Sequence, residues 1–282
     1  MIIKKLLRDA EARLEVADVP GAYAKYVLNE LLLNQNRNLY LELDQDLDEP
    51  THAIFSAMMD RLVTQEPLAY VLGYQVFLGY PIEVNPSVLI PRPETEELVL
   101  QVLMTLDEQF AHLKHPRLID IGTGSGAIAI ALKKEEPRLE VLASDISEDA
   151  LNQAKHNAKH LDAHITWLLG SMAQPLIDRN ETVDVIVCNP PYIPQDESIE
   201  VSVKDFEPHV ALFGGEDGLT FYRQVLDQAP HVLNHPGMIA FEIGWNQKDV
   251  LTHEAKLRFP DSAVTCYQDM AGKDRILIIQ IK

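Results

Sequence analysis

A glycine-rich segment and a later aspartate have the types and the spacing needed to bind an adenosine ligand. The segment Asp120-Ile-Gly-Thr-Gly-Ser-Gly126 follows an apolar run and precedes a helical pattern. Glycine lets the backbone turn sharply and approach a ligand without interference from a Cβ atom. Asp145 lies 21 residues after Gly124 and ends the next apolar run, where a carboxylate can accept hydrogen bonds from both ribose hydroxyls. These residues alone leave NAD and S-adenosylmethionine open, because Gly122-x-Gly124-x-x-Ala127 also fits a dinucleotide fingerprint.

A second motif, Asn189-Pro-Pro-Tyr192, has residue types suited to methylating a planar nitrogen. It directly follows the apolar run 185–188, and ligands of open α/β sheets bind at the carboxyl ends of strands. An amide nitrogen is a poor nucleophile because its lone pair is delocalised. The side-chain oxygen of Asn189 and the backbone oxygen of Pro190 can each accept one N–H, which points the nitrogen at the methyl group. Pro190 and Pro191 restrict φ and fix these acceptors in advance, and Tyr192 can stack on the planar group.

Further segments extend the pattern beyond these two motifs. Pro91-Arg-Pro-Glu-Thr-Glu96 and Phe206-Glu-Pro208 are more specific than Asn-Pro-Pro-Tyr, which DNA and RNA amino-methylating enzymes share. The other matching positions are Ala211, Leu212, Gly215, Gly218, Leu219, Glu242-Ile-Gly244, Gln247, Asp269 and Gly272. On these residues the chain resembles, over essentially its whole length, the bacterial release-factor glutamine methyltransferases.

The resemblance implies a cofactor, a substrate and a set of site residues. The chain would transfer a methyl group from S-adenosyl-L-methionine, leaving S-adenosyl-L-homocysteine, to N5 of the glutamine in the Gly-Gly-Gln motif of peptide chain release factors. Asn189, Pro190 and Tyr192 would be catalytic, and these three with Pro191 would bind the substrate. Cofactor contacts are expected from Gly122, Thr123, Gly124, Ser125, Gly126, Asp145, Met172 and Asn189.

One segment departs from the family's pattern. After the third strand an acid followed by an aromatic residue is expected to flank the adenine, and this chain has Ser171-Met172. Met172 can still pack on adenine because a thioether is polarizable and adaptable. Ser171 can form a hydrogen bond but brings no charge.

The elements that must position these motifs alternate between strand and helix from residue 94 onward. Apolar runs predict strands at 117–121, 139–144, 165–169, 183–188, 238–243, 263–268 and 275–281, with helices at 94–110, 127–134, 148–160, 219–233 and 246–258. The last two strands are joined too closely for a parallel pair, so this pair is expected to be antiparallel. We therefore expect the α/β fold of class I S-adenosylmethionine-dependent methyltransferases, which is Rossmann-like and mostly parallel with an antiparallel last strand.

The residues before this region predict a separate helical part. Helical patterns occupy 2–17, 22–34 and 50–64, and a short hairpin follows. The predicted organisation is an N-terminal helical substrate-recognition domain at 1–73, a hairpin linker at 74–92 and a methyltransferase domain at 93–282. A length of 282 residues agrees with two domains.

The amino-acid composition argues against some classes of binding partner. The formal net charge of −19 and the absence of a Lys/Arg run argue against binding to nucleic acid or anionic membranes. Two cysteines, no signal peptide and no long apolar run favour a cytoplasmic protein, which we expect to be a monomer. The nearest alternative is an amino-group methyltransferase acting on DNA or RNA bases. A dehydrogenase, and a nonenzymatic adenosine-binding module that would not need Asn189, are the others.

Two pairs of histidines lie four residues apart on predicted helices, namely His156 with His160 and His231 with His235. Such pairs can bind zinc. Neither pair has a third ligand or a His-Glu-x-x-His pattern in the sequence, so we expect solvated helix faces and no metal site.

Overall fold

The computed structural model describes residues 1–197 and 199–282, and the chain divides into two compact units. The first unit comprises Met1–Tyr74 together with Ile199–Phe206. The second comprises Gln75–Ser198 and Glu207–Lys282. The hairpin segment expected to be a separate linker therefore falls in the second unit from residue 75 onward.

The first unit is helical. Its helices are α1 (Ile3–Val16), α2 (Ala22–Leu33), α3 (Leu39–Glu42), α4 (Glu49–Val63), α5 (Leu68–Leu72) and α10 (Val201–Phe206). The apolar stripes of the three long helices meet in one core around Leu14, Leu28 and Phe55. The prediction of these three helices is confirmed. Helices α3 and α5 were not predicted, because helices of four or five residues are too short to show a helical repeat of apolar residues.

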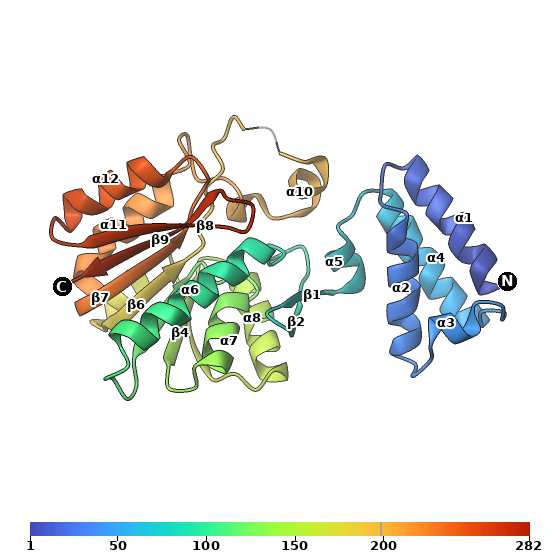
Figure 1. Cartoon of the computed structure of the whole chain (residues 1–282), viewed down its shortest axis with the longest axis horizontal. Helices are drawn as coiled ribbons and strands as arrows, with labels where there is room; N and C mark the ends of the chain where they lie inside the picture. The colour runs from blue at the N-terminus through green and yellow to red at the C-terminus, as the bar shows by residue number, and fades with distance from the viewer. Residues whose placement is uncertain (198) are drawn as a thin grey trace. The chain divides into compact units, whose positions relative to one another are not determined.

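The second unit contains a two-stranded hairpin and a seven-stranded sheet (Figure 1). The hairpin pairs β1 (Tyr74–Phe77) with β2 (Tyr80–Glu83), as predicted. The sheet has the order β5-β4-β3-β6-β7-β9-β8. Its strands are β3 (Arg117–Ile121), β4 (Glu140–Asp145), β5 (Ile165–Leu169), β6 (Val183–Cys188), β7 (Leu233–Glu242), β8 (Ala263–Gln268) and β9 (Asp274–Ile281).

The strand directions confirm the predicted fold class. From β5 to β7 every neighbouring pair is parallel, whereas β9 is antiparallel to both β7 and β8. Helices cover both faces of the sheet, so a central strand such as β6 is almost continuously apolar and buried.

Two sets of helices form the outer layers (Figure 1). α6 (Pro93–Gln109), α7 (Ala127–Glu135) and α8 (Glu148–His160) lie on one face. α9 (Gln174–Arg179), α11 (Thr220–Val232) and α12 (Lys248–Arg258) pack on the other, where Tyr222 meets strand residues such as Ile186 and Phe241. Among the described residues no helix is long and apolar enough to cross a bilayer.

The structure corrects the prediction at several places. α9 was not predicted, and its six residues are too few for a clear period. The long connection after β6 holds a 3-10 turn at His209–Ala211. β7 begins at Leu233 rather than Met238, so His235 lies in a strand and only His231 lies on α11. The expectation that His231 and His235 share a helix face is therefore wrong.

Candidate active site

The strand register brings the chemical motifs to one edge of the sheet. Ile121 of β3 is paired with Ser144 of β4 and with Cys188 of β6, and Cys188 is paired with Phe241 of β7. The next residues along the chain, at the same edge, are Gly122, Asp145, Asn189 and Glu242. The chain builds the sheet outward from β3 in both directions, so β3 and β6 flank the topological switch point. Ligands of open α/β sheets bind at such a point.

The glycine loop after β3 is shaped by packing and by backbone conformation. Gly122, Gly124 and Gly126 all have positive φ values, of 72°, 53° and 83°. A Cβ atom on Gly126 would lie 3.0 Å from the Cβ of Ala154 on α8. At Gly122 and Gly124 a Cβ would meet no atom within 4 Å. The start of α7 is therefore packed tightly against α8, whereas the rest of the loop faces open space.

Asp145 is fixed against this loop. Its Oδ2 accepts the Gly124 N–H at 2.9 Å and its Oδ1 accepts the Ser147 N–H at 2.9 Å. Burial raises the pKa of Asp145, and these backbone hydrogen bonds oppose the shift. Each carboxylate oxygen keeps a lone pair for a further donor, as the predicted ribose contact requires.

Asp120 is a candidate site residue that the sequence analysis did not assign. The side chain is fully buried, and its Oδ2 accepts the hydroxyl of Thr123 at 2.6 Å. Its Oδ1 is buried and has no hydrogen-bond partner among the described residues. Burial raises the pKa of Asp120 to about 7, and the Thr123 hydroxyl and the nearby Ala129 N–H oppose this shift. A buried carboxylate oxygen with unused capacity beside the glycine loop fits a cationic ligand group, such as the ammonium of S-adenosylmethionine.

Ser171 and Met172 occupy a turn after β5. The Ser171 hydroxyl accepts a hydrogen bond from Gln224 at 3.1 Å. Met172 has a positive φ of 50°, and its carbonyl accepts the Ser144 hydroxyl at 2.9 Å. Its partly buried side chain packs against the core. The contact of Met172 with adenine stays a prediction.

Asn189 belongs to a chain of hydrogen bonds that joins three elements. Its Nδ2 donates to the Thr95 hydroxyl on α6 at 3.2 Å. That hydroxyl donates to Oε2 of Glu242, at the end of β7, at 2.6 Å. One N–H of the Asn189 amide is therefore donated to Thr95, and the amide oxygen can accept a hydrogen bond from a substrate.

Burial and the neighbouring charges have opposite effects on the pKa of Glu242 in this network. Burial raises the pKa of Glu242 to about 7, while the Thr95 hydrogen bond and the Arg275 charge act in the opposite direction. Arg275 forms an ion pair with Asp269 at 3.2 Å and donates to the Ile243 carbonyl at 3.2 Å. Burial raises the pKa of Tyr192 to about 12, so its phenol is neutral at neutral pH and is no proton acceptor there.

The connection after Tyr192 holds the motif's backbone in place. A Cβ atom on Gly218, where φ is 73°, would overlap the Tyr192 carbonyl oxygen. The Gln247 side chain donates to that same carbonyl at 3.1 Å and accepts the Gly244 N–H at 2.8 Å. Gly218, Gly244 and Gln247, which were matched to the family pattern, therefore support the Tyr192 backbone.

The two most specific segments of the sequence are bonded to each other. Arg92 forms an ion pair with the buried Glu207, whose other carboxylate oxygen accepts the Ile90 N–H at 3.2 Å. This pair ties the segment before α6 to the connection that follows Tyr192. Thr95, the donor to Glu242, lies in the first turn of the same helix.

Comparisons with known proteins agree with this arrangement. A family model described as "Methyltransferase small domain" matches residues 98–206, and one described as "PrmC N-terminal domain" matches residues 5–73. A release factor glutamine methyltransferase from Bacillus cereus is 38% identical over 258 residues, which cover 91% of each chain. One from Enterococcus faecalis is 34% identical over 279 residues, which cover 98% of each chain. A methyltransferase structure from Pyrococcus furiosus shares the fold, with a TM-score of 0.55 and 20% identity over 80% of this chain and 98% of that one.

Sheet order, edge motifs and these matches place the protein among the Rossmann-like methyltransferases. Within that class, release factor glutamine methyltransferases are similar to this protein along nearly the whole chain. The chain belongs to the release factor glutamine methyltransferase family.

Proposed function

We propose that this methyltransferase moves a methyl group from S-adenosylmethionine to the side-chain amide nitrogen of the glutamine in the Gly-Gly-Gln motif of peptide chain release factors. The observation that carries the proposal is the register of β3 and β6. It sets the glycine loop beside Asn189-Pro-Pro-Tyr192 at the carboxyl edge of the sheet. Family membership names the release factor as the protein substrate.

The cofactor site is assigned to residues around the glycine loop. Asp120 would take the ammonium group, Asp145 the ribose hydroxyls, and the 122–126 loop would line the ligand. Met172 would pack on the adenine. The sulfonium supplies an electrophilic methyl group. The protein's part is then to bind and orient the nucleophile, because desolvation and alignment carry most of the rate of an in-line displacement.

Asn189 and Pro190 orient the substrate amide. With its Nδ2 occupied by Thr95, Asn189 presents Oδ1 to one amide N–H of the glutamine. The Pro190 carbonyl accepts the other N–H, and the Tyr192 ring stacks on the amide plane. Neither an asparagine amide nor a neutral phenol takes up a proton near neutral pH. The amide proton therefore leaves to solvent after the N–C bond has begun to form.

Replacing Thr95 by Val should lower methyl transfer by about tenfold to a hundredfold, because a hydrogen bond to a charged group is worth about 1.5–3 kcal/mol.

The parent rate should also rise with pH through about 7, the pKa of Glu242. Protonated Glu242 can donate to Thr95, whose hydroxyl is then free to turn toward Asn189 Oδ1 and compete with the substrate. Single-turnover rates measured from pH 6 to pH 8 (about one unit on either side) check both expectations. Saturating S-adenosylmethionine keeps the titration of Asp120, whose pKa is also about 7, from changing cofactor occupancy.

Thr95→Ser is the matched control because it keeps the hydroxyl, and it should retain the parent rate and pH profile. A Val variant with the parent's rate and profile would show that the Glu242–Thr95 pair does not orient Asn189.

The helical unit is proposed to hold the protein substrate rather than to do chemistry. It has its own hydrophobic core, and its sequence carries no chemical motif. Removing residues 1–73 should weaken methylation of a whole release factor while the affinity for S-adenosylmethionine survives. Calorimetric affinity and initial rates check this, with circular dichroism to establish that the shortened chain is folded. A folded variant with full activity on the whole release factor would contradict the proposed role.

We further propose that the protein acts as a monomer in the cytoplasm, where release factors work, without binding nucleic acid. The formal net charge of −19 supports the last point. Isotope-labelled S-adenosylmethionine offered with purified release factor, DNA and RNA in parallel tests the proposal. Label is expected in the release factor. Label in a nucleic acid with none in the release factor would contradict it.

A further inference from the structure

A carboxylate and two imidazoles meet at a place that the methyl-transfer site does not use. Oε2 of Glu83, on β2, lies 3.0 Å from Nε2 of His156, and its Oε1 lies 2.9 Å from Nδ1 of His160. Within residues 1–197 and 199–282 this is the single group of three His, Cys, Asp or Glu side chains close enough to hold a metal ion. The sequence showed no third side chain for His156 and His160, and the structure brings Glu83 to both rings.

The three side chains offer a donor set that zinc prefers. Their ligand atoms all lie within 4.8 Å of one another. A tetrahedral Zn²⁺ with ligands at about 2.0–2.1 Å holds its donors roughly 3.3–3.4 Å apart. All three side chains are half exposed, so small rotations can bring them to that spacing. Two histidines and one carboxylate, with water at the fourth position, form the ligand set of known zinc sites.

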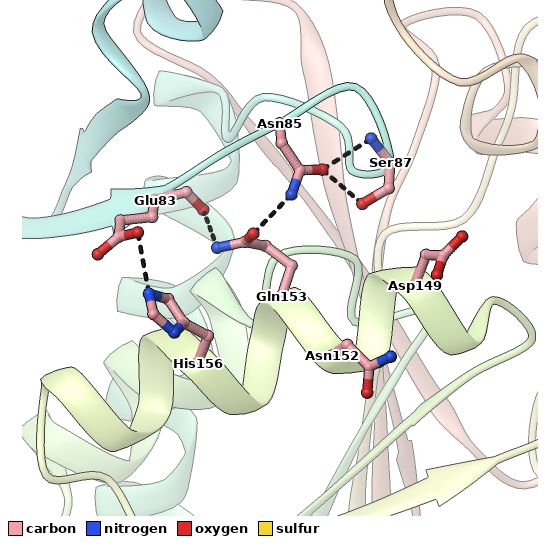
Figure 2. Close-up of a pocket in the computed structure, with 7 residues that line it drawn as sticks. All are labelled: Glu83, Asn85, Ser87, Asp149, Asn152, Gln153 and His156. Atoms are coloured by element: carbon pink, nitrogen blue, oxygen red, sulfur yellow. Dashed lines mark hydrogen bonds and ion pairs between the residues drawn. The ribbon is translucent and has the colours of Figure 1, made fainter.

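The backbone that carries Glu83 is fixed to α8, so little order is lost when an ion binds. The buried Asn157 side chain accepts the Glu83 N–H at 3.0 Å and donates to the Glu83 carbonyl at 2.9 Å. Gln153 donates to the same carbonyl at 3.2 Å. Figure 2 shows Gln153 and His156 on α8 reaching toward Glu83. These three residues line a hollow of about 510 Å³. Preorganised ligands on rigid elements are what a metal site requires.

The two imidazoles also lie close to each other. The rings of His156 and His160 lie with their centroids 4.1 Å apart. A divalent ion would bind both imidazoles and the carboxylate at once.

We propose that Glu83, His156 and His160 form a binding site for Zn²⁺ that joins β2 to α8, with water at the fourth position. The site is separate from the proposed methyl-transfer residues, but Asn157 connects the two regions. Its Nδ2 also donates to the carbonyl of Ser125, in the glycine loop, at 2.9 Å. Zinc at this place should therefore stabilise the fold around the loop without taking part in the reaction.

Calorimetric titration of the metal-free, tag-free full chain with ZnCl₂ tests the proposal. The parent should bind one Zn²⁺ with micromolar affinity, and MgCl₂ should give no heat. His156→Ala, His160→Ala and Glu83→Gln should each weaken zinc binding by roughly tenfold or more. The matched control is His231→Ala, which removes an exposed histidine from α11 and should leave the affinity unchanged.

Thermal unfolding gives a second readout that separates binding from misfolding. Zinc should raise the melting temperature of the parent and of His231→Ala, and should not raise it in the three site variants. Without zinc, the site variants should melt close to the parent, because all three side chains are about half exposed. The proposal is overturned if the parent binds no zinc, or if the site variants bind it as tightly as the parent does.

Discussion

Replacing Asn189 by Ala should lower the rate of methyl transfer by roughly a hundredfold or more, the usual loss on removing one preorganised polar group from an active site. The variant loses the oxygen that accepts the substrate N–H, and it also leaves the Thr95 hydroxyl without its donor. Binding of S-adenosylmethionine should fall less than turnover does. The single-turnover rate, measured beside the calorimetric affinity for the cofactor, checks both expectations.

Two further variants test the same role of Asn189. Asn189→Asp keeps the shape and one acceptor, but it removes the N–H bonded to Thr95 and adds a charge near Glu242, so it should also be slow. Asn152→Ala changes an exposed asparagine on α8 and should keep the parent rate. An Asn189→Ala rate within about threefold of the parent would mean that Asn189 does not orient the substrate.

Replacing Asp145 by Ala should weaken S-adenosylmethionine binding by about tenfold to a hundredfold, equivalent to about 1.5–3 kcal/mol for hydrogen bonds to a charged group. The substitution removes the proposed ribose acceptor and also frees the Gly124 N–H, which Asp145 holds at 2.9 Å. Calorimetric titration with S-adenosylmethionine measures the change.

Asp149→Ala is the matched control for this titration. Asp149 is an exposed acid in the first turn of α8, and its loss changes the net charge equally. Its affinity for the cofactor should equal the parent's. An unchanged affinity in Asp145→Ala would rule out the assigned ribose contact.

Local patterns predicted much of this fold because central strands such as β3 and β6 are mostly apolar runs bounded by polar or turn residues. β3 and β6 were predicted with the ends that the structure shows. The glycine loop, Asp145 and Asn189 were found in the same way, since each directly follows or ends a strand. Sheet order then explains why motifs far apart in sequence share one edge.

What the sequence did not reveal depends on contacts between distant segments. Glu242, Thr95 and Asn189 form one network only because β7 lies beside β6 and α6 packs on that sheet. Nothing in their spacing predicts it. The hydrogen bonds of Glu83 to His156 and His160 likewise require the hairpin to lie against α8, which helical periodicity cannot show.

Asp120 was missed for a different reason. It stands directly before the glycine loop and was included in that motif, but its significance comes from complete burial and from an oxygen with no partner among the described residues. Only packing reveals these properties. The acid two residues before the first glycine was the available sequence signal.

The most direct test of the account locates the transferred methyl group on the substrate. Purified release factor is incubated with this protein and S-adenosylmethionine, and tandem mass spectrometry of its peptides identifies the modified residue. A release factor with Ala in place of the glutamine of the Gly-Gly-Gln motif serves as the control. The account predicts one added methyl on the side-chain nitrogen of that glutamine and none on the control. A methyl group on any other residue, or equal methylation of the control, would contradict it.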